Sequence, residues 1–263
     1  MTTAIKNNIG PIAFFCDFGL PYTGQMKAAI LRAAPDVRVV DLMVDAPAFD
    51  VRASSILLAA MAESFPAGTI FVCVVDPDVG SAARLPGAVL AGGRWFVGPL
   101  NGIFEHTIRH WPEEAVIYSA DWPTENISAS FHGRDIFAPM AAKIYHQGSA
   151  IDEMTELSLG VREKFRHPEF ADDLEQIIYI DGFGNAITGV HAPTSPLNAN
   201  ANPPVVTVGG RDIPWARTFS DVPPQSPFAY ANSMNLIELA VNKGRADVFL
   251  DLNVGSQVSV SFL

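Results

Sequence analysis

The sequence contains few of the residues and segments that define several large classes of protein. It has two cysteines among 263 residues, Cys16 and Cys73, and both lie in apolar runs. Buried, reduced thiols account for such cysteines, so we expect no disulfide framework. No apolar run reaches the roughly 18 residues that a membrane-spanning helix needs, and the first residues lack the apolar core of a signal peptide. We therefore expect a cytoplasmic protein that does not associate with membranes.

Positive charge is also scarce. The chain has 17 Lys and Arg residues against 28 Asp and Glu residues, which gives a formal net charge of -11. Proteins that bind nucleic acids usually present a basic surface, so this charge argues against a nucleic-acid partner. With 49% hydrophobic and 17% charged residues, the composition is that of a globular protein with a sizeable core.

Several well-known catalytic motifs are missing from the sequence. It has no GxGxxG after a predicted strand, no phosphate-binding GxxxxGK loop, no HExxH, no CxxC and no GxSxG. These absences remove the usual sequence support for dinucleotide binding, NTP binding, zinc-peptidase activity and serine-hydrolase activity.

The N-terminal half alternates predicted strands with predicted helices, an order typical of βαβ units. Apolar runs predict strands at residues 11–16, 37–43 and 69–75, and the intervening patterns predict helices at 22–34 and 50–65. Each strand leads into a loop that bears an acidic residue. Right-handed crossovers place these loops on one edge of the sheet, where open α/β sheets bind their ligands.

Candidate functional side chains gather in these loops and in later ones. The set consists of Asp17, Asp76, Arg84, Asn101, His132 and Arg134. A carboxylate at a strand end can bind ribose hydroxyls, and an Arg with a neutral His and an Asp can hold and deprotonate a water molecule. A metal site built from Asp17, Asp45, Asp76 and Asp78 is a competing use of the same loops. The spacing alone leaves both uses open.

His132 precedes a helix that we predict within residues 128–146. The positive end of a helix dipole disfavours an imidazolium, so a neutral ring at this place can accept a proton. A capping or packing role is the more ordinary explanation for a single His before a helix.

The C-terminal part has a different pattern, made mainly of predicted strands. Strands are predicted within residues 177–190, 203–208, 247–252 and 257–262, and one helix is predicted at 233–243. We therefore predict an α/β protein with an N-terminal mixed α/β sheet domain and a C-terminal β-barrel domain. The predicted boundaries are 1–160 for the first domain, 161–175 for a linker and 176–263 for the second domain.

Seven segments of the chain resemble one known family. In chain order they are DFG…YTGQMKAAI, VVDLMVDAPAFD, GTIFVCVVDPDVGS, GPLNGIF, FHGRDIFAPMAA, IDGFGNAIT and TFSDVPPQSPFAYANSMNLIELAVNKG. Together they resemble the S-adenosylmethionine hydroxide adenosyltransferases, which are relatives of the fluorinase and chlorinase enzymes. The resemblance covers nearly the whole chain. It implies an N-terminal α/β domain, a C-terminal β-barrel, and homotrimers whose active sites lie between the N domain of one subunit and the C domain of the next.

The resemblance also implies roles for individual residues. Asp76, Arg84 and His132 would form a set that activates water. Asp17 would bind the ribose hydroxyls, and Phe49 would pack on the nucleoside. Asn185 and Ser233 would hold the methionine moiety, Phe219 would pack near adenine, and the backbone around Asn242 and Lys243 would contact the adenine edge. Asn101 would be a further substrate-binding position. No metal and no cofactor is implied.

The resemblance implies hydrolysis of S-adenosylmethionine to adenosine and L-methionine by attack of water on the ribose 5′ carbon. His132-Gly133 stands where the halogenases have Tyr-Ser, which favours water over a halide as the nucleophile. A chlorinase-like halogenase stays an alternative. Ala83 and Leu100 stand where the family commonly has Arg and Asp, so a binding protein for adenosine or S-adenosylmethionine without turnover is a further alternative. A metal-dependent phosphohydrolase is the third.

Overall fold

The structure is a computed structural model that describes residues 10–81, 85–123, 125, 127–193 and 203–262. The chain divides into two compact units, Met1–Phe170 and Ala171–Leu263. Each unit has its own sheets and its own core.

The first unit is built on a seven-stranded mixed sheet with the order β2-β1-β3-β5-β4-β6-β7. Strands β2, β1, β3 and β5 pair in parallel, and β4, β6 and β7 continue the sheet with antiparallel pairs. The strand bounds are β1 Ile12–Cys16, β2 Val39–Met43, β3 Ile70–Val74, β4 Pro86–Ala91, β5 Arg94–Pro99, β6 Val116–Ala120 and β7 Met154–Glu156. The predicted mixed α/β sheet is confirmed.

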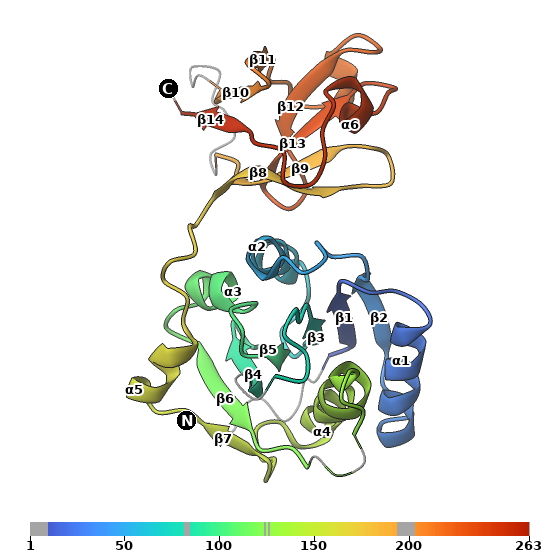
Figure 1. The fold of residues 1–263 in the computed structure, drawn as a ribbon, viewed down its shortest axis with the longest axis vertical. Helices are drawn as coiled ribbons and strands as arrows, with labels where there is room; N and C mark the ends of the chain where they lie inside the picture. Colours follow the sequence, from blue (N-terminus) through green and yellow to red (C-terminus); the bar gives the residue numbers. More distant parts are fainter. Residues whose placement is uncertain (1–9, 82–84, 124, 126, 194–202, 263) are drawn as a thin grey trace. The chain divides into compact units, whose positions relative to one another are not determined.

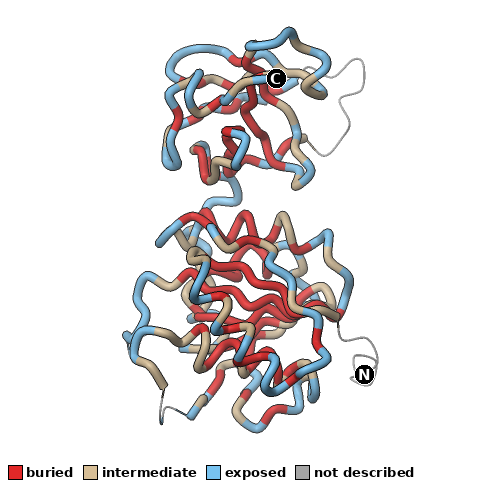
Figure 2. The backbone as a smooth tube through the Cα atoms, turned by 90° about the vertical axis from the view of Figure 1, so that its right-hand side faces the viewer, coloured by how far each residue is buried: buried red, intermediate tan, exposed pale blue. Residues whose placement is uncertain are grey.

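Helices cover both faces of this sheet (Figure 1). Helices α1 (Tyr22–Ala33) and α4 (Ala138–Gln147) lie against one face, and α2 (Val51–Ala62) and α3 (Glu105–His110) lie against the other. Strands β1 and β3 are buried along their whole length, as expected for strands covered on both faces. Figure 2 shows these buried segments in red at the centre of the unit. Asp50 caps α2 as predicted, since its Oδ1 accepts a hydrogen bond from Ala53 N at 2.9 Å.

A buried ion network attaches the end of the first unit to α3. Glu105 is 1% exposed and accepts hydrogen bonds from Arg109 Nε at 2.8 Å, Arg166 Nε at 2.9 Å and His167 N at 2.9 Å. Burial alone would raise the pKa of Glu105, but the hydrogen bonds from Arg166, His167 and Arg109 lower it to about 2. The network therefore holds the short elements α5 (Leu159–Arg162) and η3 (Glu163–Phe165), and the residues after them, against this unit.

The second unit consists of two antiparallel sheets. A four-stranded sheet has the order β12-β13-β9-β8, and a three-stranded sheet has the order β11-β10-β14. The bounds are β8 Leu174–Ile180, β9 Ala186–His191, β10 Val205–Val208, β11 Arg211–Ile213, β12 Pro227–Ala231, β13 Leu236–Val241 and β14 Ser259–Ser261, with η4 at Phe219–Asp221 and α6 at Ala246–Phe249. Residues of both sheets share one core, among them Ile177, Val206 and Leu239. Closure of these sheets into a barrel stays a prediction.

Two predicted elements of this unit are wrong. The predicted helix at 233–243 is a tight turn followed by strand β13, whose six residues are all buried. Asn232 builds the turn, because its side-chain oxygen accepts hydrogen bonds from Met234 N at 2.9 Å and Leu236 N at 3.0 Å. The predicted strand at 247–252 instead contains most of helix α6. Pairing of β13 with both β12 and β9 outweighs its local helix-like pattern.

Candidate active site

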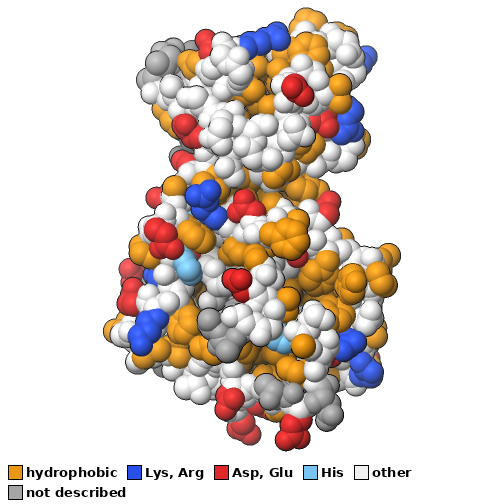
Figure 3. Space-filling view, viewed as in Figure 1, with side chains coloured by type: hydrophobic (Ala, Val, Ile, Leu, Met, Phe, Trp, Pro, Cys, Tyr) orange, Lys and Arg blue, Asp and Glu red, His pale blue; other side chains and the backbone are white. Residues whose placement is uncertain are grey.

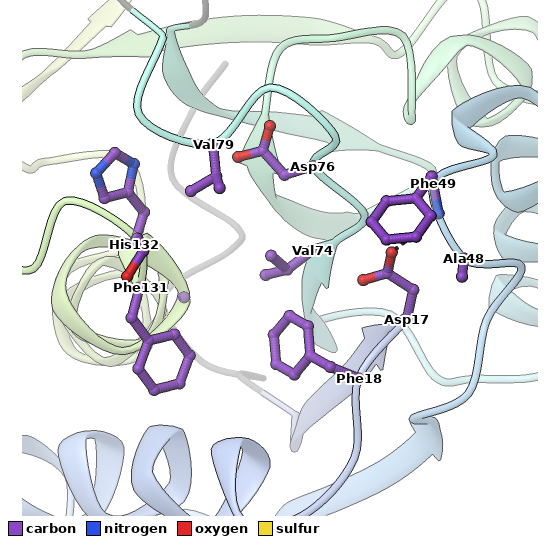
Figure 4. Close-up of a pocket in the computed structure, with 11 residues that line it drawn as sticks. Asp17, Phe18, Ala48, Phe49, Val74, Asp76, Val79, Phe131 and His132 are labelled. Carbon is purple, nitrogen blue, oxygen red and sulfur yellow. Dashed lines mark hydrogen bonds between the residues drawn. The ribbon is translucent and has the colours of Figure 1, made fainter.

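A pocket of about 250 Å³ lies at the carboxyl edge of the parallel strands in the first unit (Figure 4). Its walls come from the loops after β1, β2 and β3 and from the segment that precedes α4. The lining residues are Asp17, Phe18, Ala48, Phe49, Val74, Asp76, Val79, Ser130, Phe131, His132 and Gly133. The fold thus brings together four of the residues singled out in the sequence, Asp17, Phe49, Asp76 and His132. In the view of Figure 4, Asp17 and His132 lie on opposite sides, with Asp76 between them.

Asp17 leaves β1 and fixes the loop after β2. Its Oδ2 accepts a hydrogen bond from Phe49 N at 3.1 Å, drawn as a dashed line in Figure 4. Phe49 has a φ of 62°, a left-handed conformation that is uncommon for a bulky residue. Phe49 lines the pocket and is 76% exposed. Burial raises the pKa of the Asp17 carboxyl, and the hydrogen bond from Phe49 N partly offsets this shift.

Asp76 follows the fully buried strand β3. Both of its carboxylate oxygens are shielded from solvent. The turn after it comes very close to the segment that carries His132, because a Cβ on Gly80 would lie 3.0 Å from Ala129 O. Gly80 also has a φ of 86°, which glycine adopts without strain. A glycine at this position therefore allows the Asp76 loop and the His132 segment to form adjoining walls.

His132 begins the helical segment, one residue before a π-helical turn, η2 (Gly133–Phe137), that continues into α4. The preceding Phe131 packs edge-to-face on Phe18 and Tyr22, with ring centroids 6.1 and 5.4 Å apart. His132 thus lies at the helix start predicted from the sequence, on a segment anchored by aromatic contacts.

Several large hydrophobic side chains are exposed in the segments that follow β1 and β2. Leu20 is 83% exposed, Tyr22 is 50% exposed and Phe49 is 76% exposed. Figure 3 shows hydrophobic side chains, in orange, at the surface of the first unit between acidic ones. The pocket therefore presents two carboxylates and one imidazole among mainly hydrophobic lining residues.

Two candidate residues of the first unit, Asn101 and Arg134, are not among the residues that line the pocket. A third candidate, Arg84, lies outside the described residues. Asn101 connects two strand ends, since its Nδ2 donates to Val75 O at 3.0 Å and its Oδ1 accepts from Ile103 N at 3.3 Å. It supports the backbone immediately before Asp76.

A second pocket, of about 640 Å³, lies in the second unit. It is lined by Phe183, Asn185, Phe219, Val241, Lys243, Gly244 and Arg245. It brings together three further residues singled out in the sequence, Asn185, Phe219 and Lys243. Phe183 and Arg245 were missed, although Phe183 belongs to the quoted FGN segment and Arg245 directly follows NKG.

Hydrogen bonds fix the two loops that form this second pocket. Asn185 is 8% exposed, and its Nδ2 donates to Asp181 Oδ2 at 3.0 Å. Lys243 has a φ of 54°, and its carbonyl oxygen accepts from Gln225 Nε2 at 2.6 Å. Asn242 Nδ2 donates to Val222 O at 2.7 Å, which directs this side chain to the backbone.

Ser233 lies apart from the lining residues of both pockets. It is exposed, in the turn between β12 and β13. Neighbouring Asn232 donates from Nδ2 to Glu238 Oε2 at 2.9 Å, so the turn is attached to a buried carboxyl group.

The described residues lack two other kinds of feature. No three His, Cys, Asp or Glu side chains among them are grouped so that they could hold a metal ion. Nor does this part of the chain contain a helix long and apolar enough to cross a membrane.

Comparison with known protein families decides the relationship. The family model of the SAM hydroxide adenosyltransferase N-terminal domain matches residues 12–155, and that of the C-terminal domain matches residues 175–259. This chain belongs to the SAM hydroxide adenosyltransferase family. The resemblance found in the sequence is confirmed.

Individual members of the family match over nearly their full length. An (R)-S-adenosyl-L-methionine hydrolase from Thermus thermophilus is 36% identical, with 94% of this chain and 98% of the relative covered. One from Salinispora arenicola is 32% identical, with coverage of 95% and 97%. The crystal structure of an uncharacterized conserved protein from Thermotoga maritima superposes with a TM-score of 0.81 at 27% identity, covering 95% of this chain and 99% of that one. The fold of this chain therefore recurs in a solved structure.

Proposed function

We propose that this protein hydrolyses S-adenosyl-L-methionine to adenosine and L-methionine. Relatives named as hydrolases of this substrate match the chain at 30% to 36% identity over nearly its whole length. The observation that carries the proposal for the site is the pocket that brings Asp17, Asp76 and His132 together with Phe49. These side chains come from separate loops. Asp17 supplies an acceptor for hydroxyls and Asp76 a buried carboxylate. His132 supplies a proton acceptor and Phe49 an aromatic ring.

The proposed reaction is a displacement at the 5′ carbon of the ribose. The water oxygen forms a bond to this carbon while the carbon–sulfur bond breaks. The electron pair of the carbon–sulfur bond goes to sulfur. Sulfur leaves as a neutral thioether, so the protein supplies no proton to the leaving group. It has to hold the water in line and remove its proton.

The side chains of the first pocket suit these tasks. His132 accepts the proton of the water, and the buried carboxylate of Asp76 orients the water as a hydrogen-bond acceptor. Asp17 holds Phe49 N with Oδ2, and its carboxylate binds a ribose hydroxyl. The proposed set also includes Arg84, which lies outside the described residues.

The second pocket has the features of a recognition site. Phe219 offers a ring for adenine, Asn185 an amide for the methionine side, and the backbone of Lys243 hydrogen-bonding groups for the adenine edge. Asn101, Ser233 and Asn242 are proposed as further substrate-binding positions on the basis of the resemblance.

We also propose a homotrimer in which the first pocket of one subunit and the second pocket of the next bind a single substrate. The resemblance and the division of polar groups between two separate pockets support this assembly. Light scattering tests it, and a fully active monomer at high dilution would contradict it. Cytoplasmic location stays a prediction from the sequence.

The test of the reaction is incubation with S-adenosyl-L-methionine and chromatography of the products. We expect adenosine and methionine in equal amounts in halide-free buffer, and full activity in excess chelator. Halogenated nucleoside formed in chloride or fluoride, with no adenosine in halide-free buffer, would favour the halogenase. Stoichiometric binding in calorimetry without product over hours would favour a binding protein, and loss of activity with chelator would favour a metal-dependent enzyme.

A further inference from the structure

The wall of the first pocket that carries His132 is braced by two charged residues behind it. Residues 130–133 line the pocket, whereas Arg134 and Asp135 lie outside its lining. In Figure 4, Phe131 and His132 project from the start of the helical segment that these two residues continue. Whatever holds this segment also sets the direction of the imidazole.

Asp135 accepts hydrogen bonds from the residue before it and from the first residue of the loop 128–135. Its Oδ1 accepts from Arg134 Nε at 2.6 Å and its Oδ2 accepts from Arg134 Nη2 at 2.8 Å. Oδ2 also accepts from Ser128 N at 2.8 Å. The last bond closes the loop of residues 128–135 on itself, so the residues that line the pocket lie inside a closed ring.

Arg134 connects the same loop to α1 and to the aromatic cluster. Its Nη1 donates to Gln25 Oε1 at 3.2 Å, and its Cζ lies 5.3 Å from the centre of the Phe131 ring. A guanidinium can make a two-bond fork and a ring contact at once, which a lysine ammonium cannot.

The π-helical turn places this pair. Ala138 N donates to Gly133 O, five residues back, which widens the turn by one residue. Successive residues of a regular α-helix do not face each other, so a fork between Arg134 and Asp135 depends on this distorted turn. Space behind the turn is also limited, since a Cβ on Gly133 would lie 3.1 Å from Met26 Sδ. Turn, ion pair and α1 thus form one packed unit.

The ion pair keeps its charge at neutral pH. The hydrogen bonds from Arg134 lower the pKa of the Asp135 carboxyl, burial opposes this shift, and the hydrogen bond from Ser128 N adds to it. The side chain of Asp135 is 16% exposed, so the pair is screened less than an ion pair on the open surface.

We propose that Asp135 and Arg134 are positioning residues that hold the segment 128–132, and with it His132, in the geometry required for proton transfer. This inference rests on the proposed hydrolysis for its kinetic consequence. It requires no contact between either residue and the substrate. Proton transfer and in-line attack depend steeply on position, and a displacement of about 1 Å can cost about 100-fold in rate.

The experiment compares Asp135→Asn, Asp135→Ala and Arg134→Lys with the wild type in steady-state hydrolysis of S-adenosyl-L-methionine. Asp135→Asn retains an acceptor for Ser128 N but loses the ion pair, whereas Asp135→Ala loses both. We expect kcat to fall about 10-fold in Asp135→Asn and about 100-fold in Asp135→Ala, with Arg134→Lys near the first value. KM should change by less than about threefold, because the binding groups remain.

A matched control is Glu153→Gln, which removes the ion pair between Glu153 and Lys143 of α4, away from the pocket lining. Its kcat should equal that of the wild type. Equal kcat in the wild type and all three positioning variants would overturn the inference while leaving the proposed function intact. A rise in KM with unchanged kcat would also overturn it, since it would indicate a binding role.

Amide hydrogen exchange separates this inference from the proposed function. Exchange in residues 128–132 should be at least about 10-fold faster in Asp135→Ala, which loses the bond from Ser128 N, with exchange in β1 unchanged. If the wild type forms no adenosine, the proposed function fails, and exchange alone decides whether the pair holds the segment. Unchanged exchange would refute it. If the Asp135 variants do not fold, Arg134→Lys, which retains the charge, carries the same two measurements.

Discussion

The two units of the protein present pockets of different character. The pocket of the first unit has carboxylates and an imidazole inside, from Asp17, Asp76 and His132. The pocket of the second unit has no acidic lining residue among those described and instead has two aromatic rings with Lys243 and Arg245. Of the two pockets, the first therefore contains the carboxylates and the imidazole that can accept a proton, and the second contains aromatic and basic side chains. Chemistry and recognition are expected to respond to different substitutions.

Each unit also contains a buried glutamate, and the two glutamates differ in the direction of their pKa shifts. Glu105 is 1% exposed and Glu238 is 5% exposed. Arg166 and Arg109 lower the pKa of Glu105. Burial raises the pKa of Glu238, and its hydrogen bonds from Tyr230 and Asn232, which are uncharged, offset this only in part. Burial alone does not fix the charge of a carboxyl group, since the partners decide it.

Replacement of His132 by Ala should have the largest effect and tests whether chemistry is confined to the first unit. We expect kcat to fall about 100- to 10,000-fold, the usual range for a positioned general base. KM should change little, because His132 is proposed to contact the water and not the nucleoside. Steady-state kinetics with S-adenosyl-L-methionine measures both values.

The control for this substitution is His146→Ala. His146 is exposed, lies near the end of α4 and binds Ala33 O at 3.1 Å, away from the pocket lining. It should keep wild-type kcat. A His132→Ala enzyme with normal turnover would remove the base assignment, and an unfolded one would assign His132 a packing role instead.

Glu105→Gln should lower the free energy of unfolding by about 3 kcal/mol at neutral pH, because it leaves Arg109 and Arg166 without a buried carboxylate. The pKa of Glu105 falls from its ordinary 4.5 to about 2 on folding, so its stabilisation is complete above 4.5 and is lost as the pH falls toward 2. The wild type should lose this contribution between those pH values, and the variant should not. Denaturant unfolding across this pH range measures it.

Glu169→Gln is the matched control in the same segment. Glu169 is exposed and binds His167 Nδ1 at 2.9 Å. Its replacement should leave the unfolding free energy nearly unchanged. Equal loss in both variants would show that the buried network of Glu105 contributes no more than surface charge.

Phe219→Leu should affect recognition without affecting chemistry. Leucine keeps apolar contact with Phe228, which lies 5.1 Å away by ring centroids, but cannot stack on a base. Stacking of a base on an aromatic ring contributes about 1 to 3 kcal/mol, so KM should rise about 10-fold while kcat stays the same. Phe249→Ala, in α6 outside the pocket lining, should change neither. A fall in kcat with unchanged KM would contradict the proposal that the second unit acts in recognition and not in chemistry.

Sequence reasoning located the first pocket better than the second unit. Strand-end loops carry Asp17 and Asp76, and parallel strands bring such loops to one edge, so local patterns sufficed. Strand β13 (Leu236–Val241) was predicted as part of a helix because its local pattern contains no sign of its two neighbouring strands. The fork of Arg134 and Asp135 depends on a π turn that no spacing in the sequence indicates.

Glu238→Gln should have the smallest effect, and it tests the contrast between the two buried glutamates directly. The raised pKa means that folding disfavours the carboxylate, so the stability associated with this group is present below its unfolded pKa and is lost as the pH rises through its folded pKa. Glutamine stays neutral, and its one carbonyl oxygen can still accept from Tyr230, whose hydroxyl lies 2.5 Å from Glu238 Oε1. It loses the bond from Asn232 Nδ2, but this loss is offset by removal of a carboxylate that folding disfavours. At pH 8 the variant should therefore equal or exceed the wild type in unfolding free energy, with a difference within about 1 kcal/mol, the usual net contribution of a hydrogen bond. At pH 4 the advantage should vanish, because the wild-type carboxyl is then protonated. Thermal unfolding at both pH values measures the change, and a loss at pH 8 as large as that of Glu105→Gln would show that Glu238 acts as a stabilising carboxylate despite its uncharged partners.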